Sequence, residues 1–341
     1  MKKAIAIHGN LRTFLMPTRG NGSPLYENFL STIINPNLDE NLDVYISTDV
    51  NDFYYDGYQY YTEGNNIECV NGNSFRLYDR IKIVTKKEAK EIIESELRRI
   101  IPNIRYLNIE ENLDPEAHPS YSKLISCGRK GISAEGAINQ NYKIWDLHRA
   151  IEKSGNIYDA ILRIRFDLMN SGNFNLAGLN FSDSVIYVPG TKGILCYDWY
   201  MAGNHKNMGI FMSMYDRLAY TTDYPTWLLN CGRCGVRTVD ESEIADPNLK
   251  GISNGNCKFC NSPGCYLEDV TIANEHHIGR QASLSDINPA YPGVHTHVYR
   301  YDEVHNDSPQ KLEEILSSSN LKGSKFVNYG VDPSVKGERI L

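Results

Sequence analysis

The strongest chemical signal is the run YDAILRIRFD, residues 158–167, where charged side chains alternate with apolar ones. This alternation predicts a β-strand with Arg163, Arg165 and Asp167 on one face and apolar residues on the other. Two guanidinium groups suit bidentate binding of a diphosphate, and a carboxylate beyond them suits a divalent cation, Mn²⁺ or Mg²⁺, on the same phosphates. Such a set favours cleavage of a nucleotide sugar. The alternative is a solvent-exposed edge strand with neighbouring ion pairs.

Two Cys-x-x-Cys pairs form the second signal. They are Cys231 with Cys234 and Cys257 with Cys260, with 22 residues between the pairs. This spacing predicts four thiolates around a structural Zn²⁺. Cys265 could replace one of the four ligands or could bind no metal. Unligated or redox-active cysteines are the alternative. A closed four-thiolate site leaves no open coordination position, so the zinc is expected to support an inserted loop.

Composition limits the class of protein. The chain has 341 residues, of which 41% are hydrophobic and 23% charged, with a net charge of -7. These values are typical of a folded enzyme. The negative net charge gives no overall positive potential that would attract nucleic acid or an anionic membrane. The apolar run near the N-terminus, residues 4–7, is too short for a signal peptide or a membrane span. We therefore expect a cytoplasmic protein with reduced cysteines.

The order of apolar runs indicates the elements that would position the charged strand. Runs at 4–7, 44–46 and 81–84 predict strands, and Thr85 with Glu88 predicts a capping box that opens a helix. A second helix is expected over 138–151, before the charged strand. Residues 51–73 lack sustained periodicity and are interpreted as a surface excursion. The alternation of strands and helices predicts a parallel sheet.

Sequence blocks in a fixed order carry a resemblance to a known family. YKIWDLHRA, YDAILRIRFDL, VIYVP and YDWYMAGNHKNMG resemble a family of glycosyltransferases with the GT-A fold, common in microbial and large-virus genomes. The family has a Gly-x-x-Arg-Thr-Phe loop after its first strand, matched by Gly9, Arg12, Thr13 and Phe14. Its Arg-x-Arg-x-Asp motif is matched at 163–167. The resemblance spans roughly residues 1–220, with an echo at 266–269, where the family shows an acidic residue opening a helix.

The resemblance implies a GT-A-like, Rossmann-related α/β fold, with a mostly parallel sheet flanked by helices. It places Arg12 and Thr13 near the nucleotide, with Gly9 allowing the backbone to approach a ligand. It also places Arg163 and Arg165 on the diphosphate and makes Asp167 a metal ligand or a sugar contact. Lys143 is a further candidate for the donor site; its alternative is an exposed lysine on a helix surface. The family motif supplies one carboxylate where other GT-A enzymes have two.

An inverting transfer would need a carboxylate to deprotonate the acceptor hydroxyl, and the candidates are Asp198, Glu268 and Asp269. Trp199 and Tyr200, beside Asp198, could stack on a sugar, and Asn204 and His205 follow in a polar loop. The alternative is that Asp198 caps a turn and the aromatic residues belong to the core.

Four segments are expected: a nucleotide-sugar-binding core at 1–227, a zinc-bound insertion at 228–266, an acceptor-side part of the core at 267–316 and a loosely packed tail at 317–341. The predicted activity is that of a hexosyltransferase or related glycosyltransferase. It would use a nucleotide-sugar donor and a glycan, protein or small-molecule acceptor, in the host cytoplasm if the chain is viral. The alternatives are a nucleotidyltransferase, a phosphate-ester hydrolase, or a zinc-ribbon module that binds nucleic acid or protein.

Overall fold

The structure is a computed structural model. It describes residues 1–11, 14–15, 24–63, 81–110, 114–118, 121, 134–192, 195–196, 198–218, 227–231, 235–239, 253–255, 265–269, 281–282, 285–294 and 296–298.

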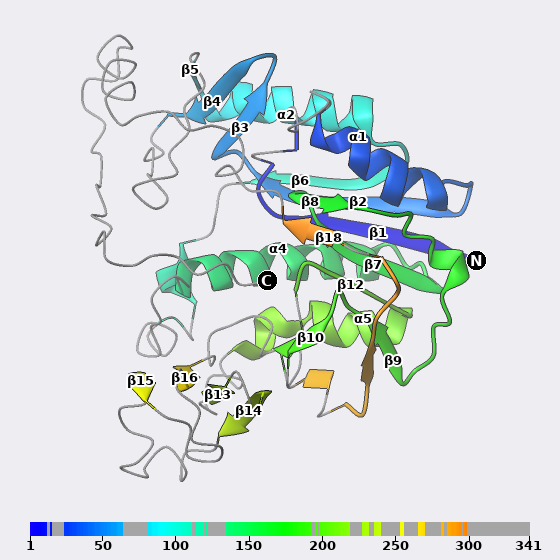
Figure 1. Ribbon diagram of the computed structural model, residues 1–341. Coiled ribbons are helices and arrows are strands. Elements are labelled where there is room, and N and C mark those ends of the chain that lie inside the picture. The colour runs from blue at the N-terminus through cyan, green and yellow to red at the C-terminus, as the bar shows by residue number, and fades with distance from the viewer. Residues whose placement is uncertain are drawn as a thin grey trace.

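A seven-stranded sheet forms the centre of the structure (Figure 1). Its spatial order is β6 (Ile104–Glu110), β2 (Leu42–Asp49), β1 (Lys3–His8), β7 (Ala160–Arg165), β12 (Tyr200–Gly203), β9 (Val185–Tyr187) and β17 (Asn288–Ala290). Neighbouring strands are parallel except that β12 runs antiparallel to both β7 and β9. The predicted α/β class and mostly parallel sheet are therefore confirmed, and the architecture is compatible with a GT-A-like fold.

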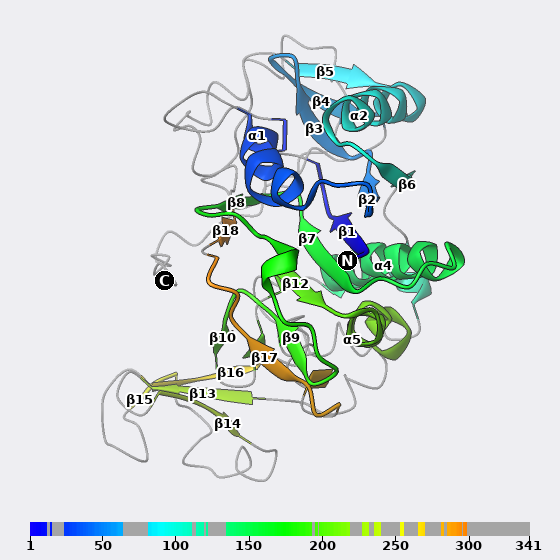
Figure 2. The same ribbon diagram turned by 90° about the vertical axis from the view of Figure 1, so that its right-hand side faces the viewer.

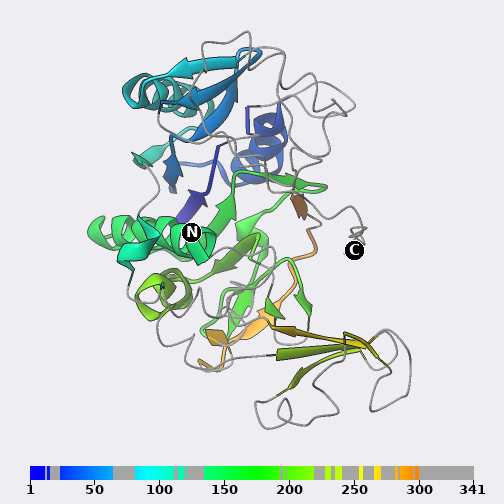
Figure 3. The ribbon, with the colours of Figure 1, turned by 90° about the vertical axis from the view of Figure 1, so that its left-hand side faces the viewer.

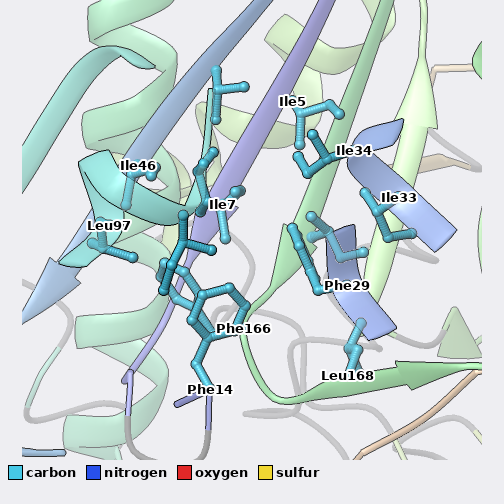
Figure 4. Close-up of a cluster of buried hydrophobic side chains, with 14 of the residues drawn as sticks. Ile5, Ile7, Phe14, Phe29, Ile33, Ile34, Ile46, Leu97, Phe166 and Leu168 are labelled. Atoms are coloured by element: carbon cyan, nitrogen blue, oxygen red, sulfur yellow. The ribbon is translucent and has the colours of Figure 1, made fainter. Parts of the chain in front are cut away.

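Helices cover both faces of this sheet (Figures 1 and 2). One face carries α1 (Leu25–Phe29), the π-helical turn η1 (Leu30–Ile34) and α2 (Lys86–Ile100); the other carries α4 (Ala134–Lys153) and α5 (His205–Met212). Because side chains alternate along β1, Ile5 and Ile7 pack under the first group, while Ala4 and Ala6 face the second. Figure 4 shows Ile5 and Ile7 in the first of these two cores, near Phe29.

Local signals explain where α2 begins. The Thr85 hydroxyl accepts a hydrogen bond from the Glu88 backbone N–H at 3.2 Å, and the Glu88 carboxylate accepts one from the Thr85 backbone N–H at 2.8 Å. This is the predicted capping box, and it satisfies backbone donors that a helix N-terminus leaves unpaired. The helix then buries Ile93 and Leu97 against the sheet.

The segment after β2 differs from the sequence interpretation. Residues 52–62 form the hairpin β3 (Asp52–Tyr55) and β4 (Tyr58–Thr62), to which β5 (Ile81–Val84) adds in parallel. The interpretation of this part as an irregular surface excursion is therefore wrong, and β5 belongs to this small sheet and not to the central one. The missed signal is Asp56-Gly57: both residues have positive φ, 48° and 76°, as a tight hairpin turn requires.

A third sheet lies at one end of the molecule (Figures 2 and 3). Its order is β14 (Gly235–Val239), β13 (Trp227–Cys231), β16 (Cys265–Asp269) and β15 (Ser253–Gly255), all antiparallel. The predicted domain boundaries stay a prediction, and the predicted tail, 317–341, lies outside the described residues.

The remaining elements are short: η2 (Asn35–Asn37), η3 (Pro115–Ala117), β8 (Leu168–Asn170) paired with β18 (Thr296–Val298), η4 (Leu176–Gly178), β10 (Thr191–Lys192) paired with β11 (Leu195–Cys196), and η5 (Met214–Arg217).

Candidate active site

The topology of the sheet indicates where a ligand would bind. From β1 the chain moves outward to β2 and β6, then returns through α4 to β7 on the other side of β1. After β1 the chain therefore continues to strands on one side of this pair, and after β7 it continues to strands on the other side. Ligands of open α/β sheets bind outside the carboxyl ends of the strands at such a switch point. The predicted Arg-x-Arg-x-Asp motif ends β7 at this place.

The end of β1 supplies a tight turn. Gly9 follows β1 with φ of 104°, a conformation that favours glycine, and a Cβ placed on it would meet no atom of the described residues beyond its chain neighbours within 4 Å. The hydroxyl of Thr48, on β2, donates a hydrogen bond of 2.8 Å to the Gly9 carbonyl. The turn is thus anchored to the neighbouring strand.

The charged strand is central, not an edge strand. β7 lies between β1 and β12, and its apolar residues enter one core as the alternation predicts. Arg163, on the opposite face, is 4% exposed and donates a hydrogen bond of 2.9 Å from Nη2 to the Asp198 carbonyl. The edge-strand interpretation is therefore wrong. A guanidinium inside an α/β sheet is costly unless it is paired, so its place at this edge calls for a functional explanation.

Arg165 and Asp167 form a bidentate ion pair at the end of the same strand. Arg165 donates from Nε to Asp167 Oδ1 at 2.8 Å and from Nη2 to Oδ2 at 2.5 Å. About a quarter of each side chain is exposed, 25% and 24%, so both are within reach of solvent and ligands. Arg165 is the most accessible of the basic groups described at this edge.

Lys143 reaches the same edge from α4. Its side chain is only 7% exposed, and Nζ forms a close ion pair with the buried carboxylate of Asp49, the last residue of β2. Nζ also donates a hydrogen bond of 3.3 Å to the side chain of Asn10. The alternative of an exposed surface lysine is therefore wrong, because α4 lies against β1 and β2 and turns this residue toward the sheet.

Asp198 lies beside these cations. Its side chain is 6% exposed; Oδ2 accepts a hydrogen bond of 2.5 Å from Gln140 Nε2 on α4, and Oδ1 lies 4.0 Å from Arg165 Nη1. Asp198 therefore belongs to the site. Tyr200 does not: it is fully buried and its ring packs against Phe174 with centroids 5.0 Å apart, so the expectation that it stacks on a sugar is wrong.

Asn204 and His205 lie away from the site because β12 is antiparallel. Its last residue, Gly203, pairs with Ile161 near the start of β7, at the opposite edge of the sheet from Arg165. Asn204 caps α5 by accepting a hydrogen bond from the Asn207 N–H at 2.8 Å. The polar loop expected near the acceptor is thus the beginning of a helix.

His8 is a site residue that the sequence interpretation did not single out. It ends β1, pairs in register with Arg165 on β7, and is fully buried. Burial, together with the positive charges of Arg163, Arg165 and Lys143, lowers the pKa of His8 well below its ordinary value of 6.5, so the ring is neutral at pH 7. Neither ring nitrogen has a hydrogen-bond partner among the described residues. Its position at the end of the first strand, directly before Gly9, was the available signal.

The other predicted site residues are not brought to this edge by the described structure. Glu268 and Asp269 lie in β16 and pair with β13, so they continue a strand where the resemblance implied the opening of a helix. Cys231 ends β13 and Cys265 begins β16, which places their backbones at the same end of that sheet. The remaining predicted residues lie outside the described residues: Arg12, Thr13, Cys234, Cys257 and Cys260.

The described residues do not fit the divalent cation predicted on Asp167. Both oxygens of that carboxylate accept hydrogen bonds from Arg165, and the carboxylates of Asp49 and Asp198 face Lys143 and Gln140. Within the part of the chain that is described, no three His, Cys, Asp or Glu side chains are grouped as a metal site needs. The predicted metal role of Asp167 gains no support from this arrangement.

No family model and no curated protein matches this chain. Among solved structures, mouse xyloside xylosyltransferase 1 in its apo form is similar at a TM-score of 0.31 and 9% sequence identity, over 63% of this chain and 71% of that chain. None of the described helices combines the length and apolar character needed to cross a membrane.

Proposed function

We propose that this chain is a glycosyltransferase that takes a sugar from a nucleotide-sugar donor and passes it to a glycan, protein or small-molecule acceptor. The observation that carries the proposal is the convergence of Lys143, Arg163 and Arg165 around the neutral ring of His8. This convergence lies at the carboxyl edge of the sheet, at the switch point between β1 and β7. A nucleotide diphosphate is the ligand whose charge and usual binding place match both features.

The three cations have different accessibilities and so different roles. Arg165 is exposed enough to contact a phosphate directly, with a planar guanidinium suited to bidentate contact. Arg163 and Lys143 lie deeper, where their charges act over a short distance through a medium of low dielectric constant. When the bond between the sugar and the phosphate breaks, its electron pair stays on the diphosphate oxygen, and these positive charges stabilise it.

Asp198 is the carboxylate best placed to act on the acceptor. It is buried, held by Gln140, and lies 4.0 Å from the guanidinium that we assign to the diphosphate. If the transfer inverts the anomeric centre, Asp198 takes the proton of the acceptor hydroxyl. Glu268 and Asp269, in β16, are the alternative bases.

The other predicted roles complete the proposal. Arg12 and Thr13 follow the Gly9 turn, which begins at the site edge, and this supports the proposal that they contact the nucleotide. A structural Zn²⁺ on Cys231, Cys234, Cys257 and Cys260 is proposed to hold the inserted sheet together. The backbones of Cys231 and Cys265 lie at the same end of that sheet, which supports the proposed zinc site and Cys265 as a further candidate ligand.

Product identification tests the activity. Purified protein is incubated with UDP-, GDP-, CMP- and dTDP-sugars, with nucleoside triphosphates and with a phosphate monoester, with and without a mixture of acceptor glycans. Release of the nucleotide from one sugar donor, with the sugar recovered on an acceptor or on water, supports the proposal. Release of pyrophosphate from a triphosphate would instead identify a nucleotidyltransferase, and release of phosphate a hydrolase.

Matched variants locate the activity. Arg165→Ala removes the accessible cation of the site, while Lys206→Ala removes a surface cation paired with Asp183 at 2.6 Å beside α5. Donor turnover should fall in the first variant and stay unchanged in the second. Equal turnover in both variants would place the activity elsewhere in the chain.

A further inference from the structure

Three carboxylates at the site edge, those of Asp49, Asp167 and Asp198, already have a positively charged or amide partner, whereas Glu110, in register with Asp49 at the end of β6, is exposed. Lys143 faces Asp49, Arg165 holds both oxygens of Asp167, and Gln140 donates to Asp198. These three carboxylates are held by Lys143, Arg165 and Gln140, whereas Mg²⁺ and Mn²⁺ need carboxylate oxygens that are free of such partners.

A divalent ion on Asp167 would also meet a strong repulsion. The carboxylate oxygens lie 2.5 and 2.8 Å from nitrogen atoms of Arg165. An ion bound to those oxygens would lie within a few ångströms of a guanidinium, which stays protonated and positively charged in proteins. Arg165 must leave Asp167 before Asp167 can hold a metal ion. Once the Arg165 guanidinium is released from Asp167, however, it can bind the diphosphate itself.

We propose that Arg165 exchanges Asp167 for the donor diphosphate, and that this exchange lets the transfer proceed without a divalent cation. This inference rests on the proposed function. The guanidinium forms with the phosphate oxygens the same pair of parallel hydrogen bonds that it forms with the carboxylate. Arg163 and Lys143 add positive charge from the buried side of the site.

The chemical step is balanced without a metal ion. The bond between the anomeric carbon and the diphosphate oxygen breaks, and its electron pair stays on that oxygen beside Arg165. The acceptor oxygen forms the new bond to the anomeric carbon, and the proton of its hydroxyl passes to a carboxylate, Asp198 in an inverting transfer. The products are the glycoside and the nucleoside diphosphate. Asp167, no longer held by Arg165, is then available to accept hydrogen bonds from sugar hydroxyls.

The variant Asp167→Asn gives opposite results in the two mechanisms. If Asp167 holds a metal ion, the variant weakens binding of the nucleoside diphosphate when that ion is present. If Asp167 competes for Arg165, the variant removes the competitor and strengthens binding. An exposed ion pair of about 1 kcal/mol corresponds to roughly fivefold tighter binding. The probes are UDP, GDP and dTDP without a sugar, so that a contact between Asp167 and the sugar does not enter the measurement.

Titration calorimetry with 1 mM Mn²⁺ or Mg²⁺, and again in buffer freed of divalent ions by a chelating resin, measures this effect. No soluble chelator is added, so that thiolate-bound zinc is retained, and the melting temperature checks the fold of each protein. Asp183→Asn is the matched control: it removes one carboxylate from an ion pair with Lys206 outside the site. We expect tighter binding for Asp167→Asn and no change for Asp183→Asn. Weaker binding for Asp167→Asn would overturn the inference.

Turnover of the identified donor provides the second measurement. In the metal-free buffer the wild-type rate should lie within about twofold of the rate with 1 mM Mn²⁺ or Mg²⁺. A tenfold lower rate without the ion would mean that the ion lowers the activation free energy by about 1.4 kcal/mol. If the rate is lost without the ion and restored with it, the inference is overturned, but the proposed glycosyltransferase activity still stands. No turnover of any sugar donor under either condition would overturn the proposed function as well.

Discussion

His8 and Arg165 are the last residues of two adjacent parallel strands, β1 and β7, and they are paired in register. A fully buried histidine thus lies beside the most accessible arginine of the site, with Arg163 and Lys143 near it. The neutral ring is compatible with this positive surrounding, whereas a protonated ring would repel it. The dependence of this site on pH follows from that relationship.

Acid should destabilise the protein through His8. Its pKa is lowered in the folded state, first by burial and then by the neighbouring cations, so below pH 6.5 the unfolded chain binds a proton that the folded chain does not. Stability from the neutral ring is complete above about pH 6.5 and is lost as pH falls, by at most about 1.4 kcal/mol per pH unit. Urea unfolding between pH 5 and 7.5 should show a smaller loss in His8→Asn. Parallel curves for the two proteins would contradict this account.

The buried pair of Lys143 and Asp49 should behave as one unit. Lys143→Met leaves the Asp49 carboxylate buried without its cation, which should reduce the free energy of unfolding by about 3–5 kcal/mol. The double variant Lys143→Met, Asp49→Asn should recover a large part of that loss, because the uncompensated charge is removed. Urea unfolding of the four proteins in a double-mutant cycle measures the coupling. Additive losses would show that the two residues do not stabilise one another.

The Gly9 turn should not accept a side chain. No atom of the described residues blocks a Cβ at Gly9, so the cost of Gly9→Ala comes from its φ of 104°, and strain of this kind costs about 1–3 kcal/mol. Gly178→Ala is the control, since a Cβ there also meets no atom within 4 Å and its φ lies outside the left-handed range. The free energy of unfolding should fall in the first variant and change little in the second. Equal values for the two variants would contradict the conformational argument.

Asp198→Asn should separate chemistry from donor binding. If Asp198 takes the acceptor proton, the rate of transfer falls by about 10²–10⁴-fold while the donor still raises the melting temperature. The amide keeps the size of the side chain, so the hydrogen bond with Gln140 can be replaced after rotation of the amide. Unchanged transfer would move the role of base to Glu268 or Asp269.

Regular local patterns made part of this structure predictable from sequence. The alternation through Arg163 and Arg165 predicted a strand with a charged face, and Thr85 with Glu88 predicted the beginning of α2. Both patterns depend on near neighbours in the chain. The Asp56-Gly57 turn was equally local, and it was missed because the surrounding tyrosines hid the alternation of the hairpin.

Long-range partners were not predictable in the same way. Lys143 is separated from Asp49 by 94 residues, and nothing near either residue indicates that α4 crosses the end of β2. The burial of Tyr200 follows from the register of β12 against β7, in which Tyr200 pairs with Ile164 and shares its core. The position of His8 at the end of the first strand can be read from the sequence, but its neighbour Arg165 is known only from the parallel pairing of β1 and β7.

The central claim, a nucleotide-sugar site at the ends of β1 and β7, is tested most directly by thermal unfolding of the wild type and Arg165→Ala with UDP-, GDP-, CMP- and dTDP-sugars. A donor at 100 times its dissociation constant stabilises the folded state by about 2.7 kcal/mol. We predict that sugars of one nucleotide raise the melting temperature of the wild type and that Arg165→Ala loses this shift while keeping its own fold. A wild-type protein whose melting temperature no donor changes, or a shift that survives in Arg165→Ala, would contradict the claim.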